Sequence, residues 1–383
     1  MKYNKFRFDE ITLNYDKKRI PLSAMERTKR QGAFRYFGAQ GVIDYVDDYI
    51  FDGKYLLIAE DGENLKSKRQ NIAQIVEGKF WVNNHAHIVQ CNDKCILEYL
   101  AYLINGKDVS GYITGSAQPK LSQANLNAME FDIPSIKEQQ DILSILLPIE
   151  QKIRINKEIN NNLEQQTQAI FKSWFVDFEL NYGIMPSDWK VSQLGSIAKI
   201  STEVFSPAKN PNVEVEHYSI PAYDEKRYPV FETSNGIKSN KYRLSSNSVM
   251  ISKLNPDTKR IWRPYCISDN PICSTEFIVY EPINPLNRDF IYSIIDSIGF
   301  SAFLCSHTTG STNSRQRATP SVTLTYDIIV PDKKTIQAFC SIVSPMYDTI
   351  ENNIKENQKL AETRDKLLPK LMSGELDVSD IEL

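Results

Sequence analysis

The stretch PSIKEQQDILSILLPIEQKIRINKEINNNLEQ, residues 134–165, decides the fold because the chain contains a second version of it. Residues 331–362 read PDKKTIQAFCSIVSPMYDTIENNIKENQKLAE, and matching positions lie 197 residues apart, as Pro134 and Pro331 do. An internal repeat of this kind indicates a duplicated architecture. We therefore expect two similar halves in one chain.

Each copy carries a coiled-coil pattern. Its seam, the row of residues predicted to face a partner helix, steps by alternate threes and fours for about four heptads. Two neighbouring seam positions are Asn in both copies, and polar seam residues lose stability but fix the register. The predicted helix-pairing residues are Ile153, Asn156, Asn160 and Leu163 in the first copy, and Ile350, Asn353, Asn357 and Leu360 in the second.

The two helices are expected to pair antiparallel and form a rod of about 60 Å, at about 1.5 Å per residue. For one copy alone, an amphipathic core helix is the simpler interpretation, but two copies favour a spacer with a domain at each end. The predicted fold is α+β, with two α/β domains separated by two long antiparallel coiled-coil helices in pseudo-two-fold arrangement. The expected segments are 1–135 and 185–331 for the domains, and 136–180 and 332–375 for the helices.

Short β-like runs and turn signals indicate a twisted sheet in each domain. Strands are expected at 36–46 (interrupted by glycines), 55–58 and 80–82, with a helix at 96–104, and then at 249–251, 277–280 and 328–330. Pro148 and Pro345 predict a kink or a short preceding helix. Phe171, Trp174, Phe175 and Phe178 form an aromatic cluster, which either packs in a core or docks a partner subunit.

Composition is typical of a soluble intracellular protein. Hydrophobic residues make up 41% of the 383 residues, the sequence holds no run of about 18 apolar residues, and its start lacks an apolar signal segment. We therefore expect a cytoplasmic protein that does not contact a membrane. The six cysteines are expected to be reduced.

The net charge of −3 hides a division between segments. Each globular segment carries one excess positive charge, and the acidic excess lies on the helices. The basic residues of the globular segments occur in short clusters. Such a cluster is commonly a solvated face, but clusters in both members of a duplicated pair favour contact with phosphate groups.

We find no catalytic constellation in the sequence. There is no glycine-rich phosphate loop ending in Lys-Ser or Lys-Thr, and no motif for S-adenosylmethionine, because Asn255-Pro256 continues as Asp257-Thr258. Asp16 and Asp332 have nuclease-like spacing to a lysine without an acidic partner. His85, His87, Cys91 and Cys95 leave three interpretations open: a structural turn, a nucleic-acid contact, or a metal site. We predict no catalytic residue and no metal.

The duplicated helices, closing at 169–175 and 367–375, resemble the shared regions of type I restriction–modification specificity subunits. The stretches 55–62, 80–87, 251–256 and 273–277 resemble that family's target-recognition domains. The resemblance implies a non-catalytic subunit whose two domains each read one half of a split, asymmetric double-stranded DNA target while the helices set the unread gap. It also implies two adenine-N6 methyltransferase subunits docked on the helices, and restriction subunits that translocate with ATP. S-adenosylmethionine, ATP and Mg would then belong to those partners.

On this hypothesis, basic and amide side chains in the loops contact phosphates and base edges. The predicted DNA-binding residues are Lys29, Arg30, Lys68, Arg69, Asn83, Asn84, His85, Ser116, Gln118 and Lys120 in the first domain, and Lys253, Asn255, Lys259, Arg260, Arg315, Gln316 and Arg317 in the second. The competing hypotheses are a scaffold that joins proteins without binding DNA, and, less favoured, an independent nuclease.

Overall fold

The computed structural model describes residues 2–67, 70–115, 118–309 and 316–378. The chain divides into two compact units, one formed by Met1–Gln151 with Glu362–Leu383 and the other by Lys152–Ala361. Each unit contains one globular domain and a part of each of two long helices.

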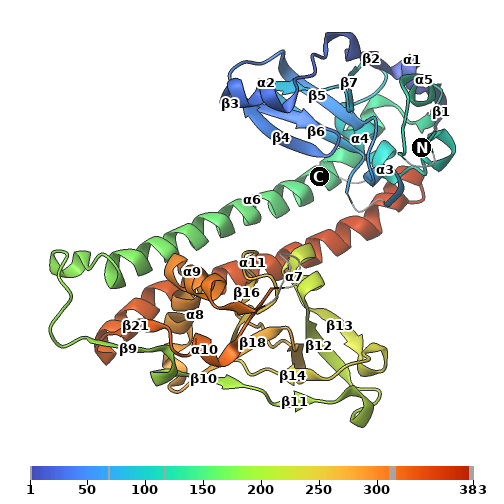
Figure 1. Cartoon of the computed structure of the whole chain (residues 1–383). Helices are drawn as coiled ribbons and strands as arrows, with labels where there is room; N and C mark the ends of the chain where they lie inside the picture. Colours follow the sequence, from blue (N-terminus) through green and yellow to red (C-terminus); the bar gives the residue numbers. More distant parts are fainter. Residues whose placement is uncertain (1, 68–69, 116–117, 310–315, 379–383) are drawn as a thin grey trace. The chain divides into compact units, whose positions relative to one another are not determined.

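A six-stranded sheet forms the body of the first domain (Figure 1). Its strand order is β2-β7-β5-β6-β3-β4, in which β3 and β6 are parallel and the other neighbours antiparallel. A separate ribbon pairs β1 with β8. The strands are β1 (Asn4–Arg7), β2 (Thr12–Asn14), β3 (Gln31–Gly38), β4 (Gly41–Val46), β5 (Phe51–Ala59), β6 (Ala73–Val82), β7 (Ala86–Cys91) and β8 (Glu130–Ile133).

Short helices connect these strands. The predicted strands are confirmed in β3 to β6, and the predicted helix at 96–104 lies within α4. The glycine interruption is a two-residue hairpin turn, in which Gly38 pairs with Gly41 and Gly41 adopts a φ of +129°, a conformation that favours glycine. The helices are α1 (Phe8–Ile11), α2 (Ala24–Lys29), α3 (Asn64–Ser67), α4 (Leu97–Gly106) and α5 (Gln123–Asn127), with 3₁₀ turns at Asp16–Lys18 and Ser110–Tyr112.

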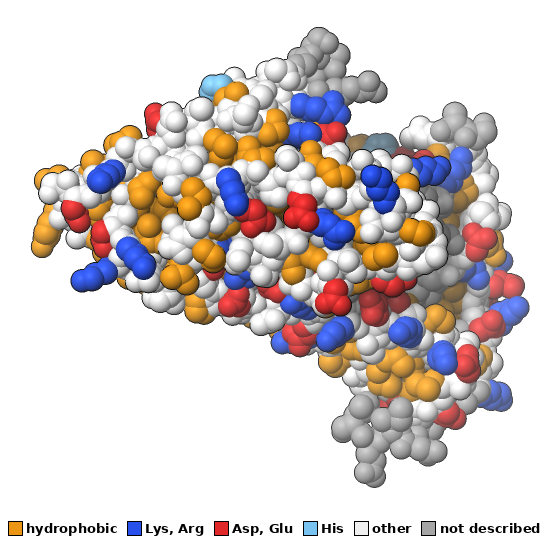
Figure 2. Space-filling view, turned by 90° about the horizontal axis from the view of Figure 1, so that it is seen from below, with side chains coloured by type: hydrophobic (Ala, Val, Ile, Leu, Met, Phe, Trp, Pro, Cys, Tyr) orange, Lys and Arg blue, Asp and Glu red, His pale blue; other side chains and the backbone are white. Residues whose placement is uncertain are grey.

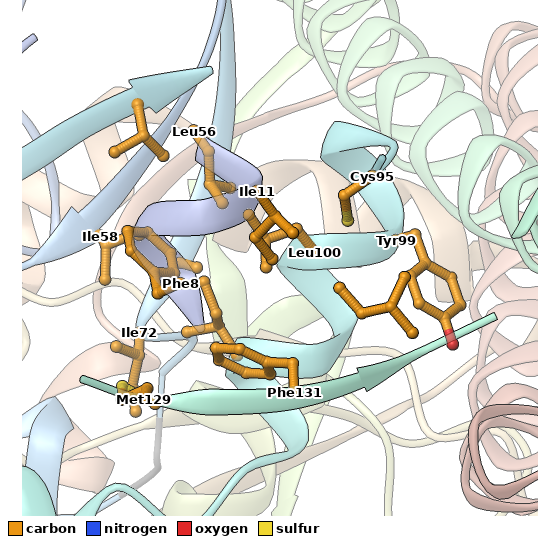
Figure 3. Close-up of a cluster of buried hydrophobic side chains, with 14 of the residues drawn as sticks. Phe8, Ile11, Leu56, Ile58, Ile72, Cys95, Tyr99, Leu100, Met129 and Phe131 are labelled. Atoms are coloured by element: carbon orange, nitrogen blue, oxygen red, sulfur yellow. The ribbon is translucent and has the colours of Figure 1, made fainter. Parts of the chain in front are cut away.

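The core of the first domain lies between the sheet, α1 and α4 (Figure 3). Phe8, Leu56 and Leu100 point toward one another and are fully buried. Burial of one such side chain contributes about 2 kcal/mol. Ile142 and Leu146, from the start of the long helix α6 (Ile136–Phe175), complete this core and fix the helix to the domain.

Two sheets form the second domain (Figure 1). One has the order β10-β18-β15-β16 and the other β11-β14-β17-β12-β13, while β9 and β21 form a ribbon and β19 and β20 a hairpin. The predicted strands at 249–251, 277–280 and 328–330 are confirmed in β15, β18 and β21. The strands are β9 (Lys190–Gln193), β10 (Ala198–Ser201), β11 (Val204–Phe205), β12 (Glu214–Tyr218), β13 (Val230–Thr233), β14 (Lys241–Arg243), β15 (Val249–Ser252), β16 (Ile261–Trp262), β17 (Pro271–Ser274), β18 (Phe277–Pro282), β19 (Thr308–Thr309), β20 (Arg317–Ala318) and β21 (Asp327–Val330).

Aromatic side chains join the end of α6 to the core of the second domain. Phe171 and Phe175 are 8% and 4% exposed and pack against Phe290, Phe339 and Trp189. The core-packing interpretation of the aromatic cluster is therefore confirmed for these two residues. The helices of this unit are α7 (Ile220–Lys226), α8 (Arg288–Asp296), α9 (Ile298–Ser306), α10 (Pro320–Thr323) and the start of α11 (Lys333–Ser373), with 3₁₀ turns at Glu179–Asn181, Leu194–Ser196, Pro207–Lys209, Ser234–Gly236 and Pro285–Asn287.

The long helices α6 and α11 begin at equivalent residues, Ile136 and Lys333. They end at Phe175 and Ser373, before the expected residues 180 and 375. Ser135 accepts a hydrogen bond from the N–H of Glu138 at the start of α6, and Asp332 accepts from the N–H of Lys334 at the start of α11. Asp332 is thus a helix cap and not part of a nuclease site. Both helices continue without a break through Pro148 and through Pro345, so the short preceding helix, one of the two expected outcomes at each proline, is not formed.

Within each unit, the parts of α6 and α11 pair antiparallel. In the second unit, Nδ2 of Asn156 donates to Oδ1 of Asn357 at 2.9 Å, and Nδ2 of Asn353 donates to Oδ1 of Asn160 at 2.8 Å. In the first unit, Leu371 and Leu146 share one hydrophobic core. The other predicted pairing residues, Ile153, Leu163, Ile350 and Leu360, are buried or half-buried, as seam residues should be.

Equivalent elements recur at the repeat distance. Strand β8 precedes α6 and strand β21 precedes α11, and the first residues of these two strands lie 197 residues apart. The first residues of α5 and α10 lie 197 residues apart as well. The fold is therefore α+β with two repeated domains, each followed by a long helix.

Among the residues that the structure describes, no single helix is both long and apolar enough to cross a membrane. One bent pair, Pro285–Asp296 with Ile298–Ser306, reaches that length and composition with an angle of 65° between its halves. Its side chains Phe290, Ile294 and Phe300 lie in the core of the second domain.

Candidate nucleic-acid interface

Three backbone segments meet beyond the ends of β5 and β7 in the first domain. The N–H of Glu60 donates to the carbonyl of His85 at 2.9 Å, and the N–H of Leu121 donates to the carbonyl of Glu60 at 2.7 Å. An isolated β-bridge also joins Asp61 to Lys120. We call this arrangement the first junction, and it comprises the described segments 60–62, 83–85, 114–115 and 118–121.

The segments 114–115 and 118–121 belong to a tight hairpin. Thr114 and Lys120 exchange two backbone hydrogen bonds, of 2.9 and 2.8 Å. Gly115 has a φ of +84°, and a Cβ at this position would lie 2.3 Å from the carbonyl oxygen of Gln118. The hairpin therefore requires glycine at residue 115. It presents the side chains of Gln118 and Lys120 to solvent.

The second domain repeats this arrangement bond for bond. The N–H of Lys253 donates to the carbonyl of Glu276 at 2.9 Å, and the N–H of Ala318 donates to the carbonyl of Lys253 at 2.9 Å. A β-bridge joins Leu254 to Arg317. We call this the second junction, and it comprises the described segments 253–255, 274–276 and 316–318.

The repeat distance and the strand registers align the two junctions residue by residue. Lys120 corresponds to Arg317, which lies 197 residues later. Strand β5 pairs Ala59 with Ala86, and β15 pairs Ser252 with Phe277 in the same way. The residue that follows β5 is therefore equivalent to the residue that follows β15. The residue that precedes β7 is likewise equivalent to the residue that precedes β18. Glu60 corresponds to Lys253, and His85 corresponds to Glu276.

The side chains on this common backbone differ, and so does the ion pair at each junction. In the first, Nζ of Lys120 lies 3.2 Å from Oε1 of Glu60. In the second, Arg317 contacts both carboxylate oxygens of Glu276, at 3.1 and 3.3 Å. The two cations remain 54% and 46% exposed. Both junctions thus hold an accessible cation in a defined position, but with different neighbouring donors and acceptors.

Buried charges lie beneath the first junction. Arg19 donates to Oε2 of Glu60 at 2.9 Å and lies 3.4 Å from Oδ2 of Asp16. Burial raises the pKa of Glu60, but the hydrogen bond from Arg19 and the neighbouring positive charges outweigh it and lower the pKa below its ordinary value. The pKa of Asp16 is also lowered, because the hydrogen bond and charge of His87 outweigh the effect of burial.

Four predicted DNA-binding residues of the first domain lie on the first junction with exposed side chains: Asn84, His85, Gln118 and Lys120. Asn83 differs from the prediction because it is 6% exposed and its Oδ1 accepts the N–H of His85 at 2.8 Å. Asn83 therefore stabilises the loop from the interior of the domain. Lys68, Arg69 and Ser116 lie outside the described residues.

Lys29 and Arg30 belong to another region of the first domain. Lys29 ends α2 with an exposed side chain. Arg30 forms an ion pair of 2.9 Å with Asp47 and lies 4.9 Å from the centre of the Trp81 ring. This part of the chain packs against β3, β4 and β6, so the structure does not bring these two residues to the junction.

In the second domain, the junction unites Lys253, Asn255, Gln316 and Arg317. The N–H of Asn255 donates to the carbonyl of Gln316 at 2.9 Å, and Asn255 has a φ of +46°, which asparagine tolerates better than most residues. Arg315 lies outside the described residues.

Lys259 and Arg260 bind acidic residues of neighbouring helices. Nζ of Lys259 donates to the carbonyl of Asp296 at 2.8 Å, at the end of α8. Arg260 holds both carboxylate oxygens of Asp224, in α7, at 2.6 and 2.9 Å. These contacts favour a structural role for both cations in place of the predicted DNA contact.

Three of the four ring nitrogens of His85 and His87 already have a hydrogen-bond partner. Nδ1 of His85 lies 2.6 Å from Oδ2 of Asp61. His87 is 1% exposed, with Nδ1 at 2.6 Å from Asp16 and Nε2 at 2.8 Å from the carbonyl of Leu121. The metal interpretation therefore has no support from the geometry, and among the described residues no acidic, histidine and cysteine group could hold a metal ion.

Sequence reasoning missed the acidic members of the junctions, Glu60, Asp61 and Glu276, because it selected residues by positive charge and amide chemistry. The repeat distance aligns Lys120 with Arg317 but not these acidic residues, whose correspondence requires the strand registers. Figure 2 shows on its visible face that Lys and Arg side chains lie among Asp and Glu side chains and do not form one continuous basic patch. The sign of the charge alone therefore does not identify the residues that form the junctions.

The described residues thus form two similar domains with equivalent but chemically different polar junctions. The family model for the type I restriction modification DNA specificity domain matches residues 2–165 and 186–362. The chain belongs to this family.

Relatives support the assignment over most of the chain. The type I restriction enzyme MjaIX specificity subunit of Methanocaldococcus jannaschii is 28% identical over 326 residues, which cover 76% of this chain and 71% of that protein. The type I restriction enzyme HindI specificity subunit of Haemophilus influenzae is 23% identical, with 85% and 84% covered. The crystal structure of the type I restriction-modification S subunit from M. genitalium has a TM-score of 0.62, with 14% identity and 97% and 96% covered, so it shares the fold.

Proposed function

We propose that this chain is the DNA-reading subunit of a type I restriction–modification complex, and that each junction reads one half of a split, asymmetric duplex target. The observation that carries the proposal is the repeated junction with changed side chains. Glu60 and His85 in one domain stand where Lys253 and Glu276 stand in the other. A common backbone that presents different donors and acceptors suits the reading of two different base sequences.

Lys120 and Arg317 are the proposed cationic contacts at the two junctions. An arginine presents a planar fork that bonds both O6 and N7 of guanine, whereas a lysine acts as a point charge toward guanine or a phosphate. The carboxylates beside them orient these cations and can accept from the amino group of cytosine. His85 and Asn84 supply further polar atoms at the first junction.

We propose that the helices set the unread gap and bind the partners. Ile155 and Ile159, one helical turn apart on α6, are 38% and 41% exposed, and Ile342 on α11 is 43% exposed. These apolar side chains suit docking of two adenine-N6 methyltransferase subunits, with ATP-driven restriction subunits joining the complex. S-adenosylmethionine, ATP and Mg would bind those partners, and the chain itself would be non-catalytic and cytoplasmic.

Methylome sequencing of a host that produces this chain with its methyltransferase subunit tests the proposal. The expected result is adenine methylation at one split sequence, absent when the chain is omitted. Binding of the purified complex to that duplex should weaken steeply with salt, because phosphate contacts release counterions. Equal binding to every duplex and no chain-dependent methylation would overturn the proposal.

The exposed apolar residues of the helices also suit a second candidate function, a scaffold that joins proteins without DNA. That function predicts partner binding that is insensitive to salt, and no loss when Arg317 is replaced by Ala. The same purified complex distinguishes the two functions, because only the DNA reader requires Arg317 for discrimination between duplexes.

A further inference from the structure

We infer that His87 is a positioning residue for the first junction: its imidazolium bridges Asp16 and the carbonyl of Leu121, and so fixes the hairpin that presents Lys120. The inference rests on the proposed function, and it concerns how one of the two reading surfaces is held in shape. His87 itself is buried beneath that surface and does not contact solvent.

The surroundings of His87 require a proton on both ring nitrogens. Nδ1 lies 2.6 Å from Oδ2 of Asp16, and Nε2 lies 2.8 Å from the carbonyl oxygen of Leu121. A carbonyl oxygen can only accept. Asp16 is held as a carboxylate, since its Oδ1 accepts the N–H of Ile88 at 2.9 Å and Arg19 lies 3.4 Å from its Oδ2. The ring therefore donates from both sides, which only the imidazolium can do.

Two carboxylates and two cations surround the ring. Asp16 and Arg19 face it from the 3₁₀ turn and the residue that follows. Glu60, after β5, lies 3.8 Å from Nδ1, and Lys120 and Arg19 both contact Glu60. These groups form one connected network that links the N-terminal turn, β5, β7 and the hairpin.

The network acts directly on the hairpin backbone. The N–H of Leu121 is bound by Glu60 and its carbonyl by His87, so both of its backbone polar groups are fixed. Lys120 is the adjacent residue, and its position follows from that of Leu121. Loss of either bond would let the cation move relative to the other segments of the junction.

The second junction uses a different support. Strand β5 pairs Ile58 with His87, and β15 pairs Ile251 with Ile278 in the equivalent place. Ile278 is 1% exposed and has no hydrogen-bonding side chain. The domains therefore provide an internal comparison, because loss of the His87 hydrogen bonds should alter the reading of only one half of the target.

The test uses the complex of this chain with its methyltransferase subunit. Methylation rates are measured on the split target and on duplexes with one base pair changed in either half, and discrimination is the ratio of the two rates. Exchange of residues 1–135 for those of a relative identifies the half that the first domain reads. His87→Ile should lower discrimination for that half about tenfold, the effect of one lost hydrogen bond, and leave the other half unchanged. Ile88→Val, a packing control on the same strand, should change neither.

A pair of substitutions at residue 16 separates this role from plain packing, and it remains informative if His87→Ile does not fold. Asp16→Asn keeps a polar partner for Nδ1 of His87, so discrimination for the first half should be largely retained. Asp16→Leu removes that partner and should lower discrimination for the first half about tenfold, the effect of one lost hydrogen bond, while discrimination for the second half stays constant.

Two results would overturn the inference: equal discrimination by the Asp16→Asn and Asp16→Leu variants, or unchanged discrimination in a folded His87→Ile variant. A complex that discriminates at neither half would instead remove the proposed function, and this inference with it.

Discussion

Asn353 on α11 donates a hydrogen bond from Nδ2 to Oδ1 of Asn160 on α6 at 2.8 Å. Asn156 and Asn357 form the same kind of amide pair one turn away, at 2.9 Å. Asn156 and Asn160 are 0% and 8% exposed, so the pairs lie inside the helix interface. A shift of one helix by a heptad would leave buried amides opposite apolar side chains, and this cost selects the observed register.

Replacement of one amide of a pair should therefore destabilise the protein more than replacement of both. Asn160→Leu leaves the Asn353 amide without its partner and should destabilise the protein by about 1–3 kcal/mol, whereas the double variant with Asn353→Leu should recover much of that loss. Chemical denaturation followed by helical circular dichroism gives both values. Asn161→Leu, on the exposed side of the same helix, should change stability by about 0.5 kcal/mol or less. Strictly additive effects of the two seam substitutions would contradict the pairing.

The lowered pKa values of Asp16 and Glu60 predict a loss of stability in acid. Their ordinary values are 3.8 and 4.5, and the folded values lie below these, so the unfolded chain binds more protons as pH falls. The stabilisation is complete above about pH 5 and disappears as pH falls through the folded values. Denaturant titrations from neutral pH down to about pH 3 should show a smaller decrease for Asp16→Asn than for the unaltered chain. Parallel curves would show that Asp16 does not contribute.

The helices could be predicted from sequence because their pattern is local. A heptad seam with asparagines at matching positions implies two paired helices, and the observed pairs Asn156–Asn357 and Asn160–Asn353 occupy those positions. The sequence left open whether a short helix would end before Pro148. The helix is continuous there, because packing against a domain outweighs the loss of one helical hydrogen bond.

The candidate site was predicted only in part, because ion pairs depend on tertiary contacts. Arg30, Lys259 and Arg260 look like free cations in the sequence, yet each bonds a carboxylate or a carbonyl brought near by the fold. Asn83 has the chemistry of a base-reading residue but points inward. The correspondence between Lys120 and Arg317 was available from the repeat distance alone, and the residues around them required the strand registers.

Arg317 should control reading of one half of the target. Arg317→Ala removes the fork held by Glu276 and should weaken discrimination at one base pair by about 1–3 kcal/mol, with less effect on the other half. Competition binding of the purified complex to single base-pair variants of the target measures this change. Lys226→Ala, which removes an exposed cation of α7 outside the junction, serves as the control. A uniform loss across all duplexes would instead make Arg317 a phosphate contact.

The length of the paired helices should set the number of unread base pairs. Seven residues inserted after Gln151 in α6 and seven after Ala361 in α11 fall at facing positions, because the amide pairs align the helices in this register. They add about 10.5 Å of helix, close to three base pairs at about 3.4 Å each. The seam keeps its phase, since a heptad restores it. Methylome sequencing should then show both half-sequences unchanged and the gap longer by about three base pairs. Insertion of three residues at each place breaks the phase and should reduce both stability and methylation, and an unchanged gap in the heptad variant would reject the spacer role.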